Sequence, residues 1–133
     1  MNTTTLPLDI AAMRRQLDDD EELIADIVAL FLDDYPRRLQ ALKAALDARD
    51  ADRVRSVAHT LKGGASNLCA SGVVEAARTL EIVSEGRDFG VISGHVDRLV
   101  THVEQVAAAL RDLQGGRSRD RSKERRVGKE CRL

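Results

Sequence analysis

The sequence predicts an all-α protein: an antiparallel up-and-down four-helix bundle with a short extra N-terminal helix. Aromatic residues are scarce, with two Phe, one Tyr and no Trp among 133 residues, whereas a β-sandwich would need aromatic and β-branched runs. Only two prolines interrupt the chain. Apolar residues of the last long segment recur at alternating steps of four and three, a spacing typical of helices that pack at small crossing angles.

The N-terminal third predicts a short helix followed by a long one. The short helix is expected from about Leu8 or Asp9 to Gln16. The acidic run at residues 18–22 then places carboxylates at the positive end of a helix dipole, which favours the start of the long helix there. Its apolar face begins with Leu23, Ile24, Ile27, Val28, Phe31 and Leu32.

Proline interrupts this long helix. Pro36 lacks a backbone N–H and predicts a kink or a break near Tyr35. The apolar spacing then resumes and continues to about Ala48.

The third helix is expected to start after Asp50, a plausible N-cap. Its apolar positions are Val54, Val57, Ala58, Leu61, Ala65 and Leu68. Gly63 and Gly64 lie inside this pattern, and a helix end at Lys62 is the alternative that two adjacent glycines suggest. Because the apolar phase continues beyond them without slipping, a continuous helix is favoured.

Two further helices complete the bundle. Ser71 is expected to cap the fourth helix, and Gly86 to end it. The fifth helix is expected to end at Gly115-Gly116. Its buried stripe is Ile92, Val96, Leu99, Val103, Val106, Leu110 and Leu113.

Charge divides the chain into a folded part and a tail. Residues 115–133 contain eight basic and three acidic residues, net +5, which leaves thirteen basic and nineteen acidic residues, net −6, in the remainder. We expect a disordered segment over 1–7, the bundle over 8–114 and a basic, disordered tail over 115–133 that could derive from a vector or from read-through. The acidic body argues against nucleic acid as its ligand.

No feature of the sequence directs the chain to a membrane. The N-terminus lacks the basic and apolar regions of a signal peptide, and no apolar run approaches the ~20 residues of a membrane span. Cys69 and Cys131 do not form a disulfide framework, so the cytoplasm is the expected location.

The most informative motif is His59-Thr60-Leu61-Lys62-Gly63-Gly64. At about 100° per residue, His59 lies about 150° from the centre of the buried stripe and should face solvent. Lys62 and Gly63 share its side of the helix. A core histidine is disfavoured by this phase, and a random surface histidine leaves the cost of two mid-helix glycines unexplained.

This surface suits phosphoryl chemistry. An exposed neutral imidazole can attack an acyl phosphate on a partner's aspartate, and Lys62 can stabilise the charge that is added. Arg55, four residues earlier, could assist, although a solvated surface charge is the simpler interpretation. The chain has no ATP-binding glycines, no Mg²⁺ carboxylate cluster and no phosphate-cradling loop, so a phosphoryl group would have to come from elsewhere.

The residues around this motif resemble the signature of histidine phosphotransfer (HPt) domains. The resemblance covers residues 20–113. It rests on Ala58 to Leu68, on Leu30-Phe31-Leu32, on Leu42, Ala45, Leu46 and Asp50, and on Thr79-Leu80-Glu81. One departure is Cys69, where the family usually has Gly, so the turn after this helix could be built differently. A small, partly buried residue is the expected role of Cys69.

The resemblance implies a phosphoryl carrier of two-component phosphorelays without kinase activity of its own. His59 would be phosphorylated, Lys62 would be the charge partner, and Gly63 would give clearance for docking. The partners implied are receiver domains and a hybrid sensor histidine kinase. The chain would need no cofactor, and Mg²⁺ would belong to the receiver.

Other interpretations remain weaker. The chain could be a helical adaptor without phosphotransfer, but His59, Lys62 and Gly63 are intact. A kinase would need an ATP-binding domain on another polypeptide. His95 and His102, seven residues apart, could not bind one metal without further ligands. Leu23 and Phe31 could form an apolar rim for a receiver, although a core role is commoner. A monomer is the default for a module that docks several partners in turn.

Overall fold

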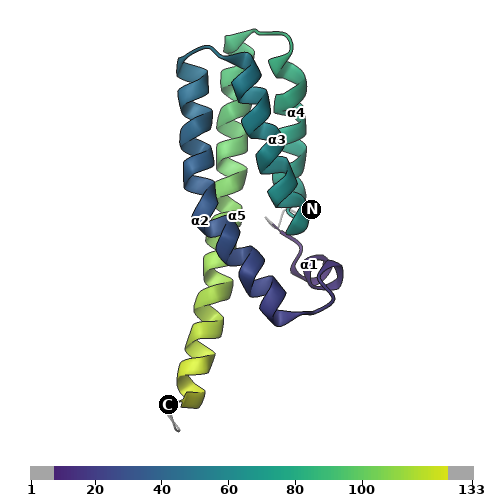
Figure 1. Ribbon diagram of the computed structural model, residues 1–133, viewed down its shortest axis with the longest axis vertical. Helices are drawn as coiled ribbons and strands as arrows, with labels where there is room; N and C mark the ends of the chain where they lie inside the picture. Colours follow the sequence, from purple (N-terminus) through teal and green to yellow (C-terminus); the bar gives the residue numbers. More distant parts are fainter. Residues whose placement is uncertain (1–7, 126–133) are drawn as a thin grey trace.

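The structure, a computed structural model, describes residues 8–125, with side chains described to residue 114. It contains five helices and no strand within those residues: α1 (Ile10–Gln16), α2 (Glu21–Asp47), α3 (Ala51–Asn67), α4 (Ser71–Ser84) and α5 (Phe89–Arg125). Helices α2 to α5 run side by side as an up-and-down bundle, and α1 lies across one end of it (Figure 1). The predicted fold class is confirmed.

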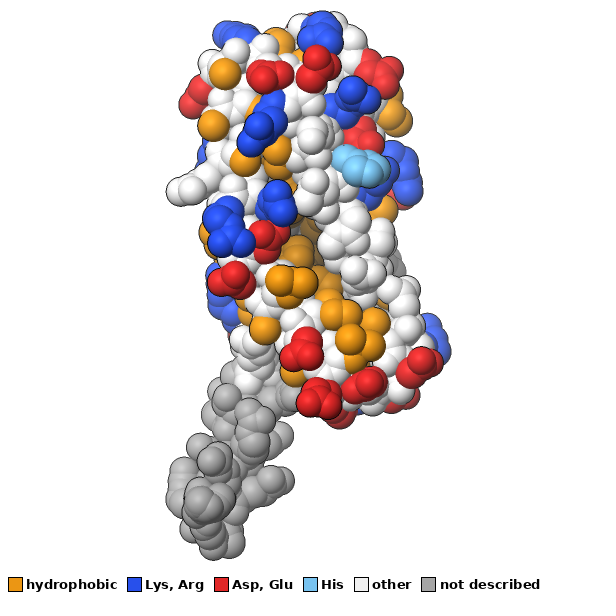
Figure 2. All heavy atoms as spheres, in the orientation of Figure 1, with side chains coloured by type: hydrophobic (Ala, Val, Ile, Leu, Met, Phe, Trp, Pro, Cys, Tyr) orange, Lys and Arg blue, Asp and Glu red, His pale blue; other side chains and the backbone are white. Residues whose placement is uncertain are grey.

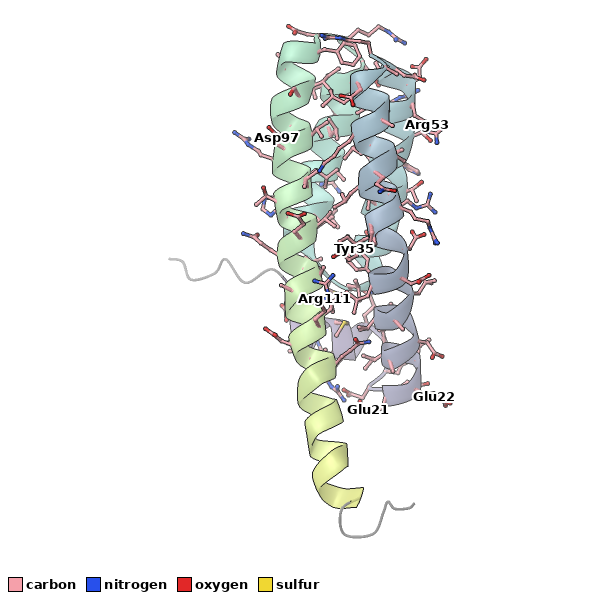
Figure 3. All side chains as sticks on the ribbon, turned by 90° about the vertical axis from the view of Figure 1, so that its left-hand side faces the viewer. Glu21, Glu22, Tyr35, Arg53, Asp97 and Arg111 are labelled. Carbon is pink, nitrogen blue, oxygen red and sulfur yellow. The ribbon has the colours of Figure 1, made fainter. Side chains whose placement is uncertain are left out.

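The interior of the bundle is aliphatic. Every helix contributes residues with at most 2% exposure, among them Met13, Ile24, Leu42, Val54, Leu68, Val73, Leu80, Ile92, Leu99 and Leu110. At the edge of this core, Tyr35 of α2 and Arg111 of α5 point toward each other (Figure 3), and the guanidinium donates a hydrogen bond to the Tyr35 hydroxyl. The stripe predicted for the last helix is buried as expected from Ile92 to Leu110, with Leu113 half-buried.

Helix α2 accommodates Pro36 without breaking. The helix is continuous from Glu21 to Asp47 with Pro36 inside it. Figure 1 shows that its first half is inclined to its second half. A proline removes one backbone hydrogen bond and crowds the preceding turn, which bends a helix that packing holds together on both sides. Of the two outcomes predicted, the kink is therefore correct.

Aspartates begin three of the helices. Asp9, Asp20 and Asp50 each accept a hydrogen bond from the backbone N–H three residues on, at 2.9, 3.0 and 3.0 Å. The prediction that Ser71 caps α4 is wrong. The buried Ala70 occupies the cap position without a side-chain hydrogen bond, so Ser71 is already the first helical residue.

Helix α5 does not end where the glycines suggested. It continues through Gly115-Gly116 to Arg125, so the predicted helix end at these glycines is wrong. A glycine costs only about 0.5–1 kcal/mol relative to alanine in a helix, and the arginines, lysine and glutamate that follow are good helix formers. The disorder predicted for 1–7 and 126–133 lies outside the described residues.

The turns after α2 and α3 use left-handed residues other than glycine. Arg49 follows α2 with φ 57° and Cys69 follows α3 with φ 55°. After α3, the Ala70 N–H donates to the Ala65 carbonyl at 3.1 Å and the Cys69 N–H donates to the Ser66 carbonyl at 3.2 Å. This is the Schellman arrangement that usually has glycine at the left-handed position. Cys69, half-buried as predicted, therefore adopts the backbone of a glycine, and the turn is not built differently.

The turn after α4 differs from its prediction in one residue. The helix ends at Ser84, near the predicted stop at Gly86. The left-handed residue there is Arg87, with φ 56°, and Gly86 does not have a positive φ.

Cys69 offers a test of this turn. We expect Cys69→Gly to be more stable than Cys69→Ala by about 0.5–1 kcal/mol. Glycine adopts the left-handed backbone without the strain of about 1–2 kcal/mol that a Cβ causes, and this gain is partly offset by the greater freedom of the unfolded chain. Both variants lose the thiol, so the comparison isolates the backbone. Urea denaturation measures the difference, and equal midpoints would contradict a left-handed residue 69.

Candidate functional site

The exposed face of α3 carries His59. The flanking core residues Ala58 and Leu61 are 0% and 4% exposed, whereas the His59 side chain is 70% exposed. This is the orientation that the apolar phase predicted. The helix continues through Gly63 and Gly64 to Asn67, so both glycines lie inside it.

A carboxylate from the neighbouring helix connects His59 and Lys62. Glu81 of α4 places Oε1 3.4 Å from Nδ1 of His59 and Oε2 2.8 Å from Nζ of Lys62. The Glu81 and Lys62 side chains are only 20% and 24% exposed, so this ion pair is partly shielded from water. Three side chains from two helices thus form one cluster, in which Nδ1 of the exposed imidazole faces the carboxylate.

Sequence reasoning missed Glu81. Glu81 belongs to a segment that carries the family resemblance. Its distance from His59 along the sequence, however, does not indicate that the two side chains are in contact. The contact depends on how α4 is rotated against α3, which single-sequence periodicity does not determine. A carboxylate beside the buried Leu80 on an adjacent helix was the available signal.

The environment of Glu81 keeps it ionised. Burial alone would raise the pKa of this carboxyl, but the hydrogen bonds and charges of Lys62 and His59 outweigh burial and lower the pKa below its ordinary value. An ionised carboxylate can only accept hydrogen bonds, so Nδ1 of His59 carries the proton toward it. In this tautomer the lone pair lies on Nε2, the nitrogen that does not face Glu81.

The lowered pKa of Glu81 predicts a pH dependence of stability. A carboxyl with a lower pKa in the folded state stabilises the protein above its unfolded value of 4.5, and this contribution is lost as pH falls through that value and through the folded pKa below it. Chemical denaturation between pH 3 and 7 should show Glu81→Gln losing less stability than the wild type on acidification. Parallel curves for the two proteins would contradict the ion pair.

Gly63 leaves the surface beside His59 open. A Cβ added there would meet no atom within 4 Å outside its own helix backbone. A Cβ at Gly64 would reach only Cδ1 of Phe31, at 4.0 Å. Packing within the chain therefore does not require glycine at residue 63.

A shallow groove of about 270 Å³ adjoins His59 on its N-terminal side. It is lined by Asp52, Arg55, Ser56, His59, Thr60 and Glu81. Asp52 also pairs with Arg87 at 2.9 Å, which ties the start of α3 to the turn after α4. Figure 2 shows one face of the molecule, on which basic, acidic and histidine side chains lie close together in the upper part.

The remaining candidates lie elsewhere. His95 and His102 line a separate groove between α4 and α5. Among the described residues, no three His, Cys, Asp or Glu side chains form a group that could hold a metal ion. Phe31 is 9% exposed and belongs to the core, whereas Leu23 is 40% exposed. Within the described part, no helix has the length and apolar character needed to cross a membrane.

An exposed histidine on a four-helix bundle, flanked by a lysine and an open glycine, defines the class of histidine phosphotransfer domains. Residues 26–116 match the model of the Hpt domain, and the chain belongs to this family. Its members are phosphotransfer proteins of phosphorelays: they carry phosphoryl groups, are not kinases, and interact with receiver domains and hybrid kinases.

Solved structures agree with the fold. The chain is similar to histidine-containing phosphotransfer protein B of Pseudomonas aeruginosa PAO1, with 23% identity, a TM-score of 0.76, and coverage of 84% of this chain and 96% of that one. It is also similar to the HPT domain of a sensor hybrid histidine kinase from Shewanella, with 16% identity, a TM-score of 0.72, and coverage of 83% and 95%. No curated protein sequence matches the chain.

Proposed function

We propose that His59 accepts a phosphoryl group from the aspartyl phosphate of a receiver domain and passes it to the aspartate of another receiver. The observation that carries this proposal is a histidine whose side chain is 70% exposed and whose Nδ1 faces an ionised carboxylate, Glu81, at 3.4 Å. A ring held in this way has its nucleophilic lone pair directed at an incoming partner. Glu81 would hold the His59 ring in the same orientation during transfer to the chain and during transfer from it.

The transfer balances without a co-reactant. The Nε2 lone pair attacks phosphorus, the N–P bond forms, the P–O bond to the partner's aspartate breaks, and that carboxylate leaves. The ring gains positive charge, and its Nδ1 proton stays beside Glu81. Lys62 stabilises the negative charge of the phosphoryl group. In the reverse step the next aspartate attacks phosphorus, and the neutral imidazole leaves.

The chain contributes only half of the reaction centre. The proposed Mg²⁺ belongs to the receiver, and the chain uses no metal, cofactor or ATP of its own. The partners are receiver domains and a hybrid sensor histidine kinase rather than nucleic acid or membrane, and the chain acts as a monomer.

The variant Gly63→Ala separates the effect of residue 63 on receiver docking from its effect on the stability of the fold. The added Cβ meets nothing in the chain, so we expect the variant to be about 0.5–1 kcal/mol more stable than the wild type. The same methyl group projects beside His59 and should slow transfer from a receiver several-fold. Gly64→Ala is the matched control, because it gains similar stability but directs its Cβ toward Phe31. Equal transfer rates for the two variants would remove Gly63 from the docking surface.

The proposed reaction leaves a chemical signature. Incubation with a receiver domain carrying labelled aspartyl phosphate should transfer label to the chain. The bound label should be acid-labile and base-stable, as expected for an N–P bond. Label that survives acid would indicate a hydroxyl ester and contradict phosphorylation of histidine.

A further inference from the structure

We propose that Arg55 holds the phosphoryl group on His59, as a second cation that acts beside Lys62. This inference rests on the proposed phosphorylation of His59. Arg55 and His59 both line the groove of about 270 Å³ on the exposed face of α3. The groove would therefore be the binding site of the phosphoryl group.

The position of Arg55 is suitable. It precedes His59 by four residues on a continuous helix, so the two side chains are neighbours on one face, with Cβ atoms about 5–6 Å apart. At about 100° per residue, Arg55 lies about 40° from His59, on the side of the helix where Lys62 also lies. An arginine side chain can span this separation and reach oxygens on the outer nitrogen of the ring.

The charges at the groove assign Arg55 a role that Lys62 cannot fill alone. Lys62 is paired with Glu81 at 2.8 Å, and Arg87 is paired with Asp52 at 2.9 Å, so each of these cations already faces a carboxylate. Arg55 forms no ion pair with any residue that the structure describes. It is thus the cation of this groove whose charge is not already balanced.

Phosphorylation of His59 would provide the negative charge that Arg55 can pair with. A phosphoryl group adds about 1.5 to 2 negative charges. It would arrive next to the ionised Glu81, which repels it. A guanidinium meets phosphoryl oxygens with two parallel N–H donors, which gives both charge and orientation. Arg55 would therefore slow the hydrolysis of phosphohistidine and favour its formation.

Phosphoramidate tests this inference without a partner protein. This small donor can phosphorylate an exposed histidine directly, so the rate depends on groups of the chain alone. We expect Arg55→Gln to form phosphohistidine about three- to tenfold more slowly than the wild type and to lose it faster, with Arg55→Lys intermediate. The matched control is Arg53→Gln, because Arg53 is an exposed arginine of the same helix that points away from the bundle (Figure 3). Arg53→Gln should match the wild type.

A phosphorus NMR titration provides a readout that a structural role would not change. Arg55 should lower the pH at which the phosphoryl group on His59 takes up its proton, and Arg55→Gln should raise that pH. If Arg55→Gln matches Arg53→Gln in rate, lifetime and titration, the inference is wrong. If the wild type takes up no label, or His59→Gln takes up as much as the wild type, the proposed function fails instead.

Discussion

His59→Gln should take up no label from a phosphorylated receiver domain. Glutamine is polar and of similar reach, but its amide nitrogen has no lone pair available for attack on phosphorus. Because the His59 side chain is 70% exposed and outside the core, the variant should fold like the wild type. Rapid mixing with labelled receiver, followed by separation in alkaline gel buffer, measures the loss.

The other histidines of the chain supply the controls. The sequence contains three histidines, and His95 and His102 line a groove between α4 and α5. His95→Gln and His102→Gln should take up label at the wild-type rate. Uptake by His59→Gln at the wild-type rate would show that another residue carries the phosphoryl group.

Lys62→Ala should slow transfer about tenfold to a hundredfold and shorten the lifetime of phosphohistidine. The substitution removes a charge-assisted contact to the phosphoryl group, and such contacts contribute about 1.5–3 kcal/mol. It also leaves Glu81, whose side chain is only 20% exposed, as an uncompensated negative charge next to His59. Single-turnover kinetics in both directions measure the effect, and unchanged rates would remove Lys62 from the mechanism.

A double variant separates these two causes. Lys62→Ala combined with Glu81→Gln restores neutrality but not the cation. If Lys62 acts only by balancing Glu81, the double variant should regain the rate of Glu81→Gln alone. We expect partial recovery, because Lys62 also meets the phosphoryl group.

The helices could be predicted where apolar periodicity is long and regular. The spacing from Ile92 to Leu110 and the unbroken phase across Gly63 and Gly64 each correspond to a buried stripe in the structure. The same phase placed His59 on the exposed face. Orientation about a helix axis is a local property, so one sequence is sufficient to predict it.

Features that depend on contacts between helices could not be predicted in this way. Glu81 meets His59 and Lys62 only because α4 packs against α3 in one particular rotation. Buried Ala70 occupies the N-cap position of α4 because the turn after α3 places it there, although Ser71 is the better cap by residue type. Cys69 holds a left-handed backbone because the turn requires it. In each case tertiary packing overrides local preference.

The predicted end of the last helix was wrong, and it lay at residues that often break helices. Gly115-Gly116 lies inside α5, just as Pro36 bends α2 without ending it. Each residue carries a cost of a few kcal/mol or less, which neighbouring hydrogen bonds and packing can offset. A breaker residue therefore indicates a weak point in a helix and not always its end.

The resting site combines a neutralised pair with an exposed nucleophile. Glu81 orients the His59 ring and at the same time forms an ion pair with Lys62. The imidazole lone pair is therefore presented on a surface without a large net charge. The proposed chemistry starts only when a partner supplies the phosphoryl group and its metal. On this proposal the chain by itself is a carrier, and its rate depends on how well a partner completes the site.

The position of the phosphoryl group on the imidazole tests the proposed carrier role most directly. The wild-type chain, labelled with nitrogen-15 and phosphorylated by a receiver domain, can be examined by phosphorus and nitrogen NMR. We predict one phosphoryl group, bonded to Nε2 of His59, with the proton of that ring on Nδ1 beside Glu81. A phosphoryl group on Nδ1, on another histidine or on an oxygen would contradict it.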